Sequence, residues 1–296
     1  WAHVLAALGA VGLILNYVTA AGRWYNGPTL VALGGVMAIY LVSAFLHDSG
    51  RHPAISKFLE RLPPSIGRAI FLWPLGALLP VWIAVAWYGS ILRHPWLGAA
   101  LAATGLAYVG LGQWLARRKT EYRLPLHVLA FALAAVGIVA ARGDSWAQMT
   151  ALYGSVAVIA ALAFLHREPI LTALAATLFL WPFQIALTLS PLEPHAHSLA
   201  YALLATVGYL PLGLRLARAG RRFASSAYIL AYGMAVYAIA ASVLGRLGAY
   251  SRDVPWVAVL VPLIVTGQQL FSLYRLRRSG FGWAAAIVFP IAFGQT

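Results

Sequence analysis

The feature that most constrains this chain is a series of apolar runs, each about 20 residues long, separated by short loops that hold the charged residues. Of the 296 residues, 62% are hydrophobic and 9% are charged. Within a bilayer every backbone N–H and C=O group must be bonded inside the protein, so only helices and closed barrels can cross it. The runs lack the period-two alternation of barrel strands. The sequence therefore predicts an all-α, polytopic transmembrane helix bundle.

The apolar runs define about eleven helices. We expect them at about 2–20, 28–46, 67–89, 96–116, 124–141, 146–165, 170–190, 198–216, 224–244 and 255–274, with an eleventh beginning near residue 281.

One short motif recurs within these runs. The sequence FLWP occupies residues 71–74 and again 179–182, and a weaker copy, IVFP, occupies 287–290. Pro74, Pro182 and Pro290 are therefore spaced 108 residues apart. Helices 4 and 8 also match at an offset of 101, which pairs Tyr108 with Tyr209. The pattern predicts repeats of four helices, and an even helix number gives each repeat the same orientation in the membrane.

The repeats suggest three domains. We assign 1–123 to the first four-helix repeat, 124–222 to the second and 223–296 to an incomplete third, and we expect the natural chain to continue with at least a twelfth helix. The longest loop contains a segment near 54–62 that reads as an amphipathic helix on the inner leaflet, or equally as a loop packed on neighbouring helix ends.

Basic residues are distributed unevenly between the two sets of loops. Sixteen of the 21 lysines and arginines fall in alternate loops and five fall in the others. The positive-inside rule places the richer set, and the amino end, in the cytoplasm. We expect the cytoplasmic (inner) membrane of a bacterium. The net charge of +14 does not indicate nucleic-acid binding, because the basic residues form no continuous surface of a soluble domain.

Ionisable residues are missing from the middle of every expected span. All seven acidic residues fall in loops or at helix ends. This argues against a proton relay, an ion-coupled carrier with a buried acid, and a voltage sensor, since such sites need charge within the membrane. The chain has no cysteine, which excludes thiolate metal sites and cysteine nucleophiles.

Four histidines fall at cytoplasmic helix ends: His3, His47, His127 and His166. Imidazoles at one depth could ligate haem or a metal. The third repeat has Tyr228 and Tyr274 instead, which favours amphipathic interfacial rings. We therefore expect no cofactor and no metal. In the outer loops, Asp144 and Asp253 could serve a membrane enzyme, but helix capping is the simpler interpretation.

The proline-containing helices suggest a cavity. Proline removes a backbone donor and kinks a helix, so three matched kinks in helices 3, 7 and 11 could line a shared space. The candidate cavity-lining residues are Pro74, Pro182, Pro290, Gln184, Gln268 and Gln269. Buried amides also bond helices to one another, and we favour that structural role.

Two functions remain after these exclusions. We expect a structural or accessory membrane protein without enzymatic activity, a subunit of a larger membrane assembly whose partners are the bilayer and other membrane subunits, with no nucleic acid. The alternative is an uncoupled transporter, channel or lipid-handling protein. A membrane enzyme is the weakest interpretation, because the outer loops are short for a catalytic platform.

Overall fold

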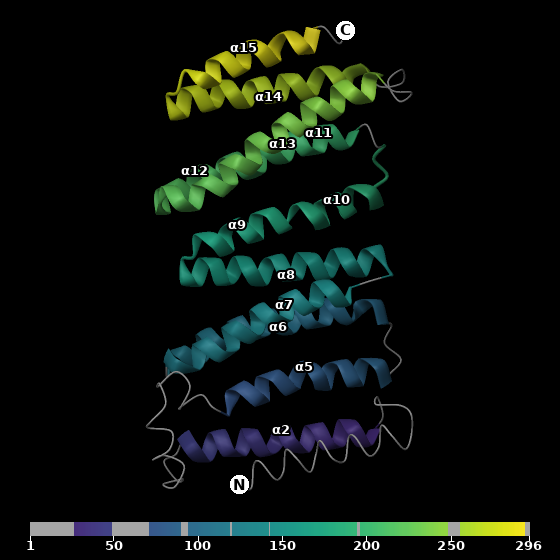
Figure 1. The fold of residues 1–296 in the computed structure, drawn as a ribbon, viewed down its shortest axis with the longest axis vertical. Helices are drawn as coiled ribbons and strands as arrows, with labels where there is room; N and C mark the ends of the chain where they lie inside the picture. The colour runs from purple at the N-terminus through teal and green to yellow at the C-terminus, as the bar shows by residue number, and fades with distance from the viewer. Residues whose placement is uncertain are drawn as a thin grey trace. The chain divides into compact units, whose positions relative to one another are not determined.

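Every regular element in the described part of the chain is a helix (Figure 1). The computed structural model describes residues 27–48, 71–89, 94–118, 120–141, 143–193, 196–247 and 255–293. The chain divides into two compact units, Trp1–His166 and Arg167–Thr296.

The first unit contains five described α-helices and two short 3-10 turns. In chain order these are α2 (Gly27–Asp48), α5 (Leu72–Gly89), η1 (His94–Trp96), α6 (Leu97–Ala116), η2 (Thr120–Tyr122), α7 (Arg123–Ala140) and α8 (Ser145–His166). Helix α6 packs against both α7 and α8, and α5 packs against α2 and α7.

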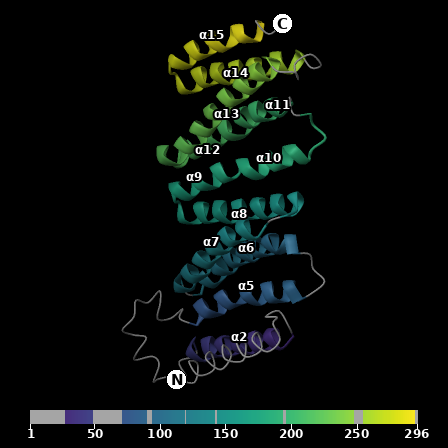
Figure 2. The same ribbon diagram turned by 45° about the vertical axis from the view of Figure 1, so that its right-hand side comes forward.

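The second unit contains a helix with a break, a helix with a π-helical turn, and three further helices. In chain order these are α9 (Pro169–Leu178), α10 (Leu180–Leu189), α11 (Ala196–Leu203), the π turn η3 (Leu204–Tyr209), α12 (Leu210–Ala219), α13 (Arg221–Leu247), α14 (Pro255–Leu276) and α15 (Gly280–Phe293). Helices α14 and α15 lie side by side in both ribbon views (Figures 1 and 2).

Eight helices in the described ranges are long and apolar enough to cross a membrane. Two of these spans combine several elements: Pro169–Leu189 joins α9 and α10, and Ala196–Arg218 joins α11, η3 and most of α12. Two shorter apolar helices, Leu72–Ala86 and Gly280–Ala292, add to them. The prediction of an all-α protein with membrane-spanning helices is therefore confirmed, and the chain is an integral membrane protein.

Other parts of the prediction are left open. Ten of the eleven expected segments contain a helix, and the first, at 2–20, lies outside the described residues, as does the segment near 54–62. The count of eleven stays a prediction. The three repeats at 1–123, 124–222 and 223–296 likewise stay a prediction.

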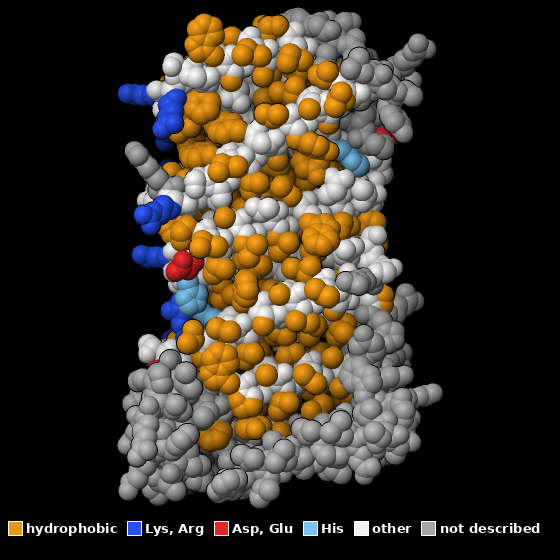
Figure 3. All heavy atoms as spheres, viewed as in Figure 1, with side chains coloured by type: hydrophobic (Ala, Val, Ile, Leu, Met, Phe, Trp, Pro, Cys, Tyr) orange, Lys and Arg blue, Asp and Glu red, His pale blue; other side chains and the backbone are white. Residues whose placement is uncertain are grey.

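The surface and interior are arranged as in a protein solvated by lipid. Large apolar side chains such as Phe164, Ile170 and Ile229 are exposed. In the space-filling view, hydrophobic side chains cover the middle of the helices, while Lys and Arg lie at helix ends (Figure 3). The interior instead holds small residues: Ala130, Ala134 and Ala151, among others, are almost completely buried. Small buried residues allow close helix contact, which drives association where the hydrophobic effect cannot.

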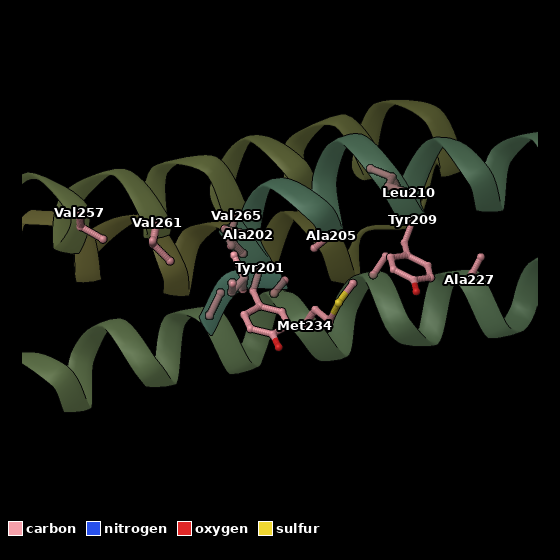
Figure 4. Packing of buried hydrophobic residues seen from close by; sticks show 14 residues of the cluster. Tyr201, Ala202, Ala205, Tyr209, Leu210, Ala227, Met234, Val257, Val261 and Val265 are labelled. Carbon is pink, nitrogen blue, oxygen red and sulfur yellow. The ribbon is translucent and has the colours of Figure 1, made fainter. Parts of the chain in front are cut away.

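A cluster of buried side chains forms the core of the second unit (Figure 4). Ala202 and Ala205 come from α11 and η3, Ala227 and Ala231 from α13, and Val261 with its neighbours from α14. All of these are small or β-branched, so the three helix backbones approach closely and hold the polar side chains between them in fixed positions.

The same close contact occurs once in each unit. A Cβ atom at Gly112 of α6 would lie 2.8 Å from the ring of His127 on α7, and one at Gly213 of α12 would lie 2.8 Å from the ring of Tyr228 on α13. Both pairs are related by an offset of 101 residues. Glycine is required at both positions, because the ring occupies the space of a side chain.

Candidate functional site

The three motif prolines lie in different local environments. Pro74 is half-buried near the start of α5, Pro182 is fully buried in α10, and Pro290 is exposed in α15. Pro74 belongs to the first unit and the other two belong to the second. A cavity shared by all three therefore stays a prediction.

Pro182 breaks the helix in which it lies. Helix α9 ends at Leu178 and α10 begins at Leu180, although Phe179 keeps helical dihedral angles. Because proline has no N–H group, the carbonyl of Leu178 four residues earlier loses its donor. In this broken turn the hydroxyl of Tyr209 donates to the carbonyl of Ala176. This bond lies two residues before Leu178 and joins the broken helix to the helix that carries Tyr209.

In the first unit a tyrosine bonds the carbonyl that a proline deprives of its donor. Pro80 lies inside α5, so the carbonyl of Gly76 has no donor four residues later. The buried hydroxyl of Tyr108, on α6, donates to that carbonyl over 2.7 Å. Tyr108 and Tyr209 are the pair that the sequence matches at an offset of 101 residues.

Gln268 stands at the centre of a buried polar group between α14, α13 and the π turn. Its side chain is fully buried. The Nε2 atom donates to the carbonyl of Ala231 over 3.4 Å, and the Oε1 atom lies 3.5 Å from the hydroxyl of Thr206, which also donates to Ala202. These two amide bonds are long, and they join three helical segments at one point.

The polar group continues along α14 toward its carboxyl end. Ser272 is buried and donates to the carbonyl of Gln268, and it accepts a hydrogen bond of 2.8 Å from the hydroxyl of Tyr232 on α13. Gln269 is also buried. We call Thr206, Tyr232, Gln268 and Ser272 the polar seam. Its side chains bond to one another and to backbone carbonyls, which is how polar groups hold membrane helices together.

Gln184 lies apart from the polar seam. It is exposed in α10, and its Oε1 atom accepts a hydrogen bond from Tyr201 of α11. Tyr201 contacts Phe183 and Tyr237 edge to face, at centroid distances of 5.4 and 5.1 Å. Gln184 therefore bonds α10 to α11 and leaves its amide nitrogen at the surface of the unit.

Two of the four histidines at helix ends lie against each other. Nδ1 of His127 and Nε2 of His166 lie 2.7 Å apart, and the rings are nearly perpendicular. Nε2 of His127 is buried beside Gly112 without a hydrogen bond of normal geometry, although the ring also interacts with the backbone of Val109. Among the described residues, no group of three or more His, Asp or Glu side chains could hold a metal ion. His3 lies outside these residues, so the expected absence of metal stays a prediction.

Asp144 has the capping role that its position suggests. Its Oδ1 atom accepts hydrogen bonds from the backbone N–H groups of Trp146 and Ala147, at 2.8 and 3.1 Å, where α8 begins. Asp253 lies outside the described residues.

Several residues of these contacts were not found from the sequence. Thr206, Tyr232 and Ser272 are common residue types in apolar runs, and only the packing of three helices brings them to Gln268. The π turn could have been suspected, because Pro211 lies two residues after its end. Tyr108 and Tyr209 were matched in the sequence as a repeat pair, but their bonds to α5 and α9 could not be read there.

The comparisons with known proteins give no relative. No protein-family model matches the chain, and no curated protein or solved structure is significantly similar to it.

Proposed function

We propose that this protein is a structural or accessory subunit of a larger membrane assembly and has no enzymatic activity of its own. The observation that carries this proposal is the polar seam. Two of its four side chains, those of Gln268 and Ser272, are buried, and the four side chains together bond within the bundle and join α13, α14 and η3. Groups used in this way stabilise a fixed helix arrangement and are not available to a passing solute.

The first unit supports the same interpretation. The buried hydroxyl of Ser155 on α8 donates to the carbonyl of Ala134 on α7 over 2.9 Å. Together with the bond from Tyr108 to α5, this gives two buried hydroxyls of the first unit a partner on another helix. Both units are therefore built as rigid packing surfaces with an apolar exterior, which suits a protein that binds lipid and other membrane subunits.

We further propose three parallel four-helix repeats, about eleven helices and a cytoplasmic amino end, in the inner membrane of a bacterium. Two pairs of equivalent contacts support the repeats: Gly112 on His127 with Gly213 on Tyr228, and the bonds made by Tyr108 and Tyr209. The orientation is supported by the arginines at the carboxyl ends of α12 and α14, which occupy equivalent ends of successive hairpins.

Purification from native membranes in mild detergent tests the proposed function. Native mass spectrometry of the gently extracted protein should show it bound to at least one other membrane protein in a fixed ratio. A chain that leaves the membrane alone, and that moves a solute when reconstituted into liposomes, would reject the proposal.

A second candidate, an uncoupled carrier or channel, is favoured by one observation. The exposed amide of Gln184 lies two residues after Pro182, next to the aromatic rings of Tyr201 and Phe183. If Gln184 lines a path, Gln184→Leu should abolish transport while insertion is normal. Thr188→Val is the matched control, since Thr188 is exposed one turn later on the same helix and bonds only to that helix. Unchanged flux in Gln184→Leu would remove Gln184 from the path.

A further inference from the structure

Exposed arginines gather at one end of the second unit. The turn from α12 to α13 and the turn from α14 to α15 lie on the same side of this unit in both ribbon views (Figures 1 and 2). Six exposed arginines belong to these helix ends and turns, and we call them the arginine cluster: Arg215, Arg218, Arg222, Arg275, Arg277 and Arg278.

Three half-buried aromatic rings connect the helices that carry the cluster. Tyr228 of α13 fills the space beside Gly213 of α12, where a Cβ atom would lie 2.8 Å from its ring. Tyr232 stacks on Tyr228 and on Phe281 of α15, with centroid distances of 6.5 and 5.2 Å. Its hydroxyl donates to Ser272 of α14 over 2.8 Å. These three rings, the aromatic row, therefore join the ends of all four helices.

The arginines lie just beyond the aromatic row, toward the end of the unit. Arg215 lies two residues past the glycine that contacts the row, or about 3 Å along α12. Arg275 lies three residues past the serine that bonds to it, or about 4.5 Å along α14, and Arg222 precedes Tyr228 by six residues, or about 9 Å along α13. Three helices thus present guanidinium groups at neighbouring levels.

The positive charge of the cluster is not balanced by its own helices. Helices α12, α13 and α14 contain neither Asp nor Glu. Among the described residues at this end of the second unit the one acid is Glu168, which directly follows Arg167 in the chain. The cluster therefore attracts anions that these helices do not supply, and guanidinium groups bind phosphate through paired N–H donors.

The side chains beside the cluster favour a lipid over a soluble anion. On α14 Phe271 is 47% exposed and Tyr274, directly before Arg275, is 80% exposed, and on α15 Trp283 is 74% exposed. Exposed aromatic rings of this kind are typical of the level where headgroups meet acyl chains. Because the chain is an integral membrane protein, headgroup phosphates are the anions that lie at this level.

We propose that the arginine cluster binds the headgroup of an anionic phospholipid. Guanidinium groups of α12, α13 and the end of α14 donate to the phosphodiester oxygens, and the acyl chains lie along the exposed apolar side chains of α14 and α15. This site goes beyond the proposed function, because it needs no partner subunit.

Lipid binding to the full chain, stripped of lipid in detergent, tests the site. Native mass spectrometry during titration compares phosphatidylglycerol with phosphatidylcholine, which has the same phosphodiester and acyl chains but a compensating positive charge. We expect phosphatidylglycerol to bind at least about fivefold more tightly, which is the contribution of one arginine near an anionic headgroup. Equal binding of the two lipids, or displacement of phosphatidylglycerol by inorganic phosphate at the same concentration, would overturn the proposal.

Two triple variants separate the cluster from general positive charge. Loss of three cluster arginines should weaken phosphatidylglycerol binding about 100-fold, at about fivefold for each; the variant combines Arg222→Gln, Arg275→Gln and Arg278→Gln. The matched control removes three exposed arginines outside the cluster and should weaken binding less than about threefold, because distant surface charges are screened; it combines Arg117→Gln, Arg118→Gln and Arg167→Gln. Equal losses in both would show diffuse attraction and no site.

A single substitution gives the same answer without a large change of charge. Arg222 is exposed, so Arg222→Gln should unfold at the temperature of the unchanged chain and bind phosphatidylglycerol about fivefold more weakly. A folded Arg222→Gln variant with unchanged affinity would contradict the proposed headgroup contacts.

Discussion

Two helix pairs can be compared: α6 with α7 in the first unit, and α11–η3–α12 with α13 in the second. Their sequences match at an offset of 101 residues, but the helices make different contacts. At one position Gly105 faces the carbonyl of Ala130 and the methyl of Val158, while at the equivalent position Thr206 contacts Gln268, which bonds the carbonyl of Ala231. At this position the first unit joins three helices through small apolar contacts, whereas the second unit joins three helical segments through polar contacts.

The backbone conformation also differs between these two helices. Gly110 of α6 corresponds to Pro211, and α6 is a regular helix, whereas η3 has the N–H of Leu210 bonded to the carbonyl five residues earlier at Ala205. Proline removes one donor, and the wider π turn redistributes the remaining bonds. The helix type therefore differs between the two units at this position, while the contact of Gly213 with Tyr228 is kept.

The largest effect is expected at the closest backbone contact of the first unit. A Cβ atom at Gly98 would lie 2.4 Å from the carbonyl oxygen of Gly137. Gly98→Leu should lower the free energy of unfolding by about 3 kcal/mol, because backbone cannot move aside as a side chain can. Denaturant titration in detergent measures it, with Gly110→Leu as the control at a site where nothing lies within 4 Å. Equal stability of the two variants would show that α6 and α7 do not cross at Gly98.

The next largest effect on stability is expected for the polar contacts of Gln268 in the second unit. Gln268→Val should lower the free energy of unfolding by about 1–2 kcal/mol, since Thr206 and the carbonyl of Ala231 lose a partner. The reverse change in the first unit, Val158→Gln, should cost about 1–3 kcal/mol because Gly105 offers the amide no side-chain partner. A double-mutant cycle of Gln268→Val with Thr206→Val checks the coupling. Strict additivity would contradict a direct contact.

A smaller effect is expected for the two tyrosines that cover proline-affected turns. Tyr108→Phe and Tyr209→Phe should each lower the free energy of unfolding by about 1 kcal/mol, the value of one hydrogen bond between membrane helices. Tyr274→Phe, at a side chain that is 80% exposed, should change it by much less. If all three variants behave alike in thermal unfolding, the hydroxyl bonds to α5 and α9 do not contribute.

Helix positions were predictable from the sequence because hydrophobic length alone determines a membrane span. The expected segments at 96–116 and 146–165 became α6, Leu97–Ala116, and α8, Ser145–His166. The break at Phe179 followed from Pro182. The partners of buried polar groups were not predictable: Gln268 was noted as a polar residue in helix 10, but its bonds to Thr206 and Ala231 depend on how three helices cross.

The smallest change in stability is expected for a substitution at Pro211, whose main consequence is a local change of helix type. Pro211→Gly gives the second unit the residue that the first unit has at Gly110, and we expect η3 to become a regular α-helix with a change of only a few tenths of a kcal/mol in stability. Carbon chemical shifts of Ala205 and Leu210 in solid-state NMR report the change. A π turn that persists in this variant would mean that packing, and not the proline, imposes it.

The direct test of the repeat is whether both glycine–ring contacts exist in the membrane. The chain has no cysteine, so introduced pairs give an unambiguous signal. We predict that Gly112→Cys with His127→Cys, and Gly213→Cys with Tyr228→Cys, each form a disulfide rapidly on mild oxidation in native membranes, and that Gly110→Cys with His127→Cys does not. If only the first pair forms a disulfide, or if the Gly110 control forms one as fast as either pair, α6 on α7 and α12 on α13 do not cross in the same way.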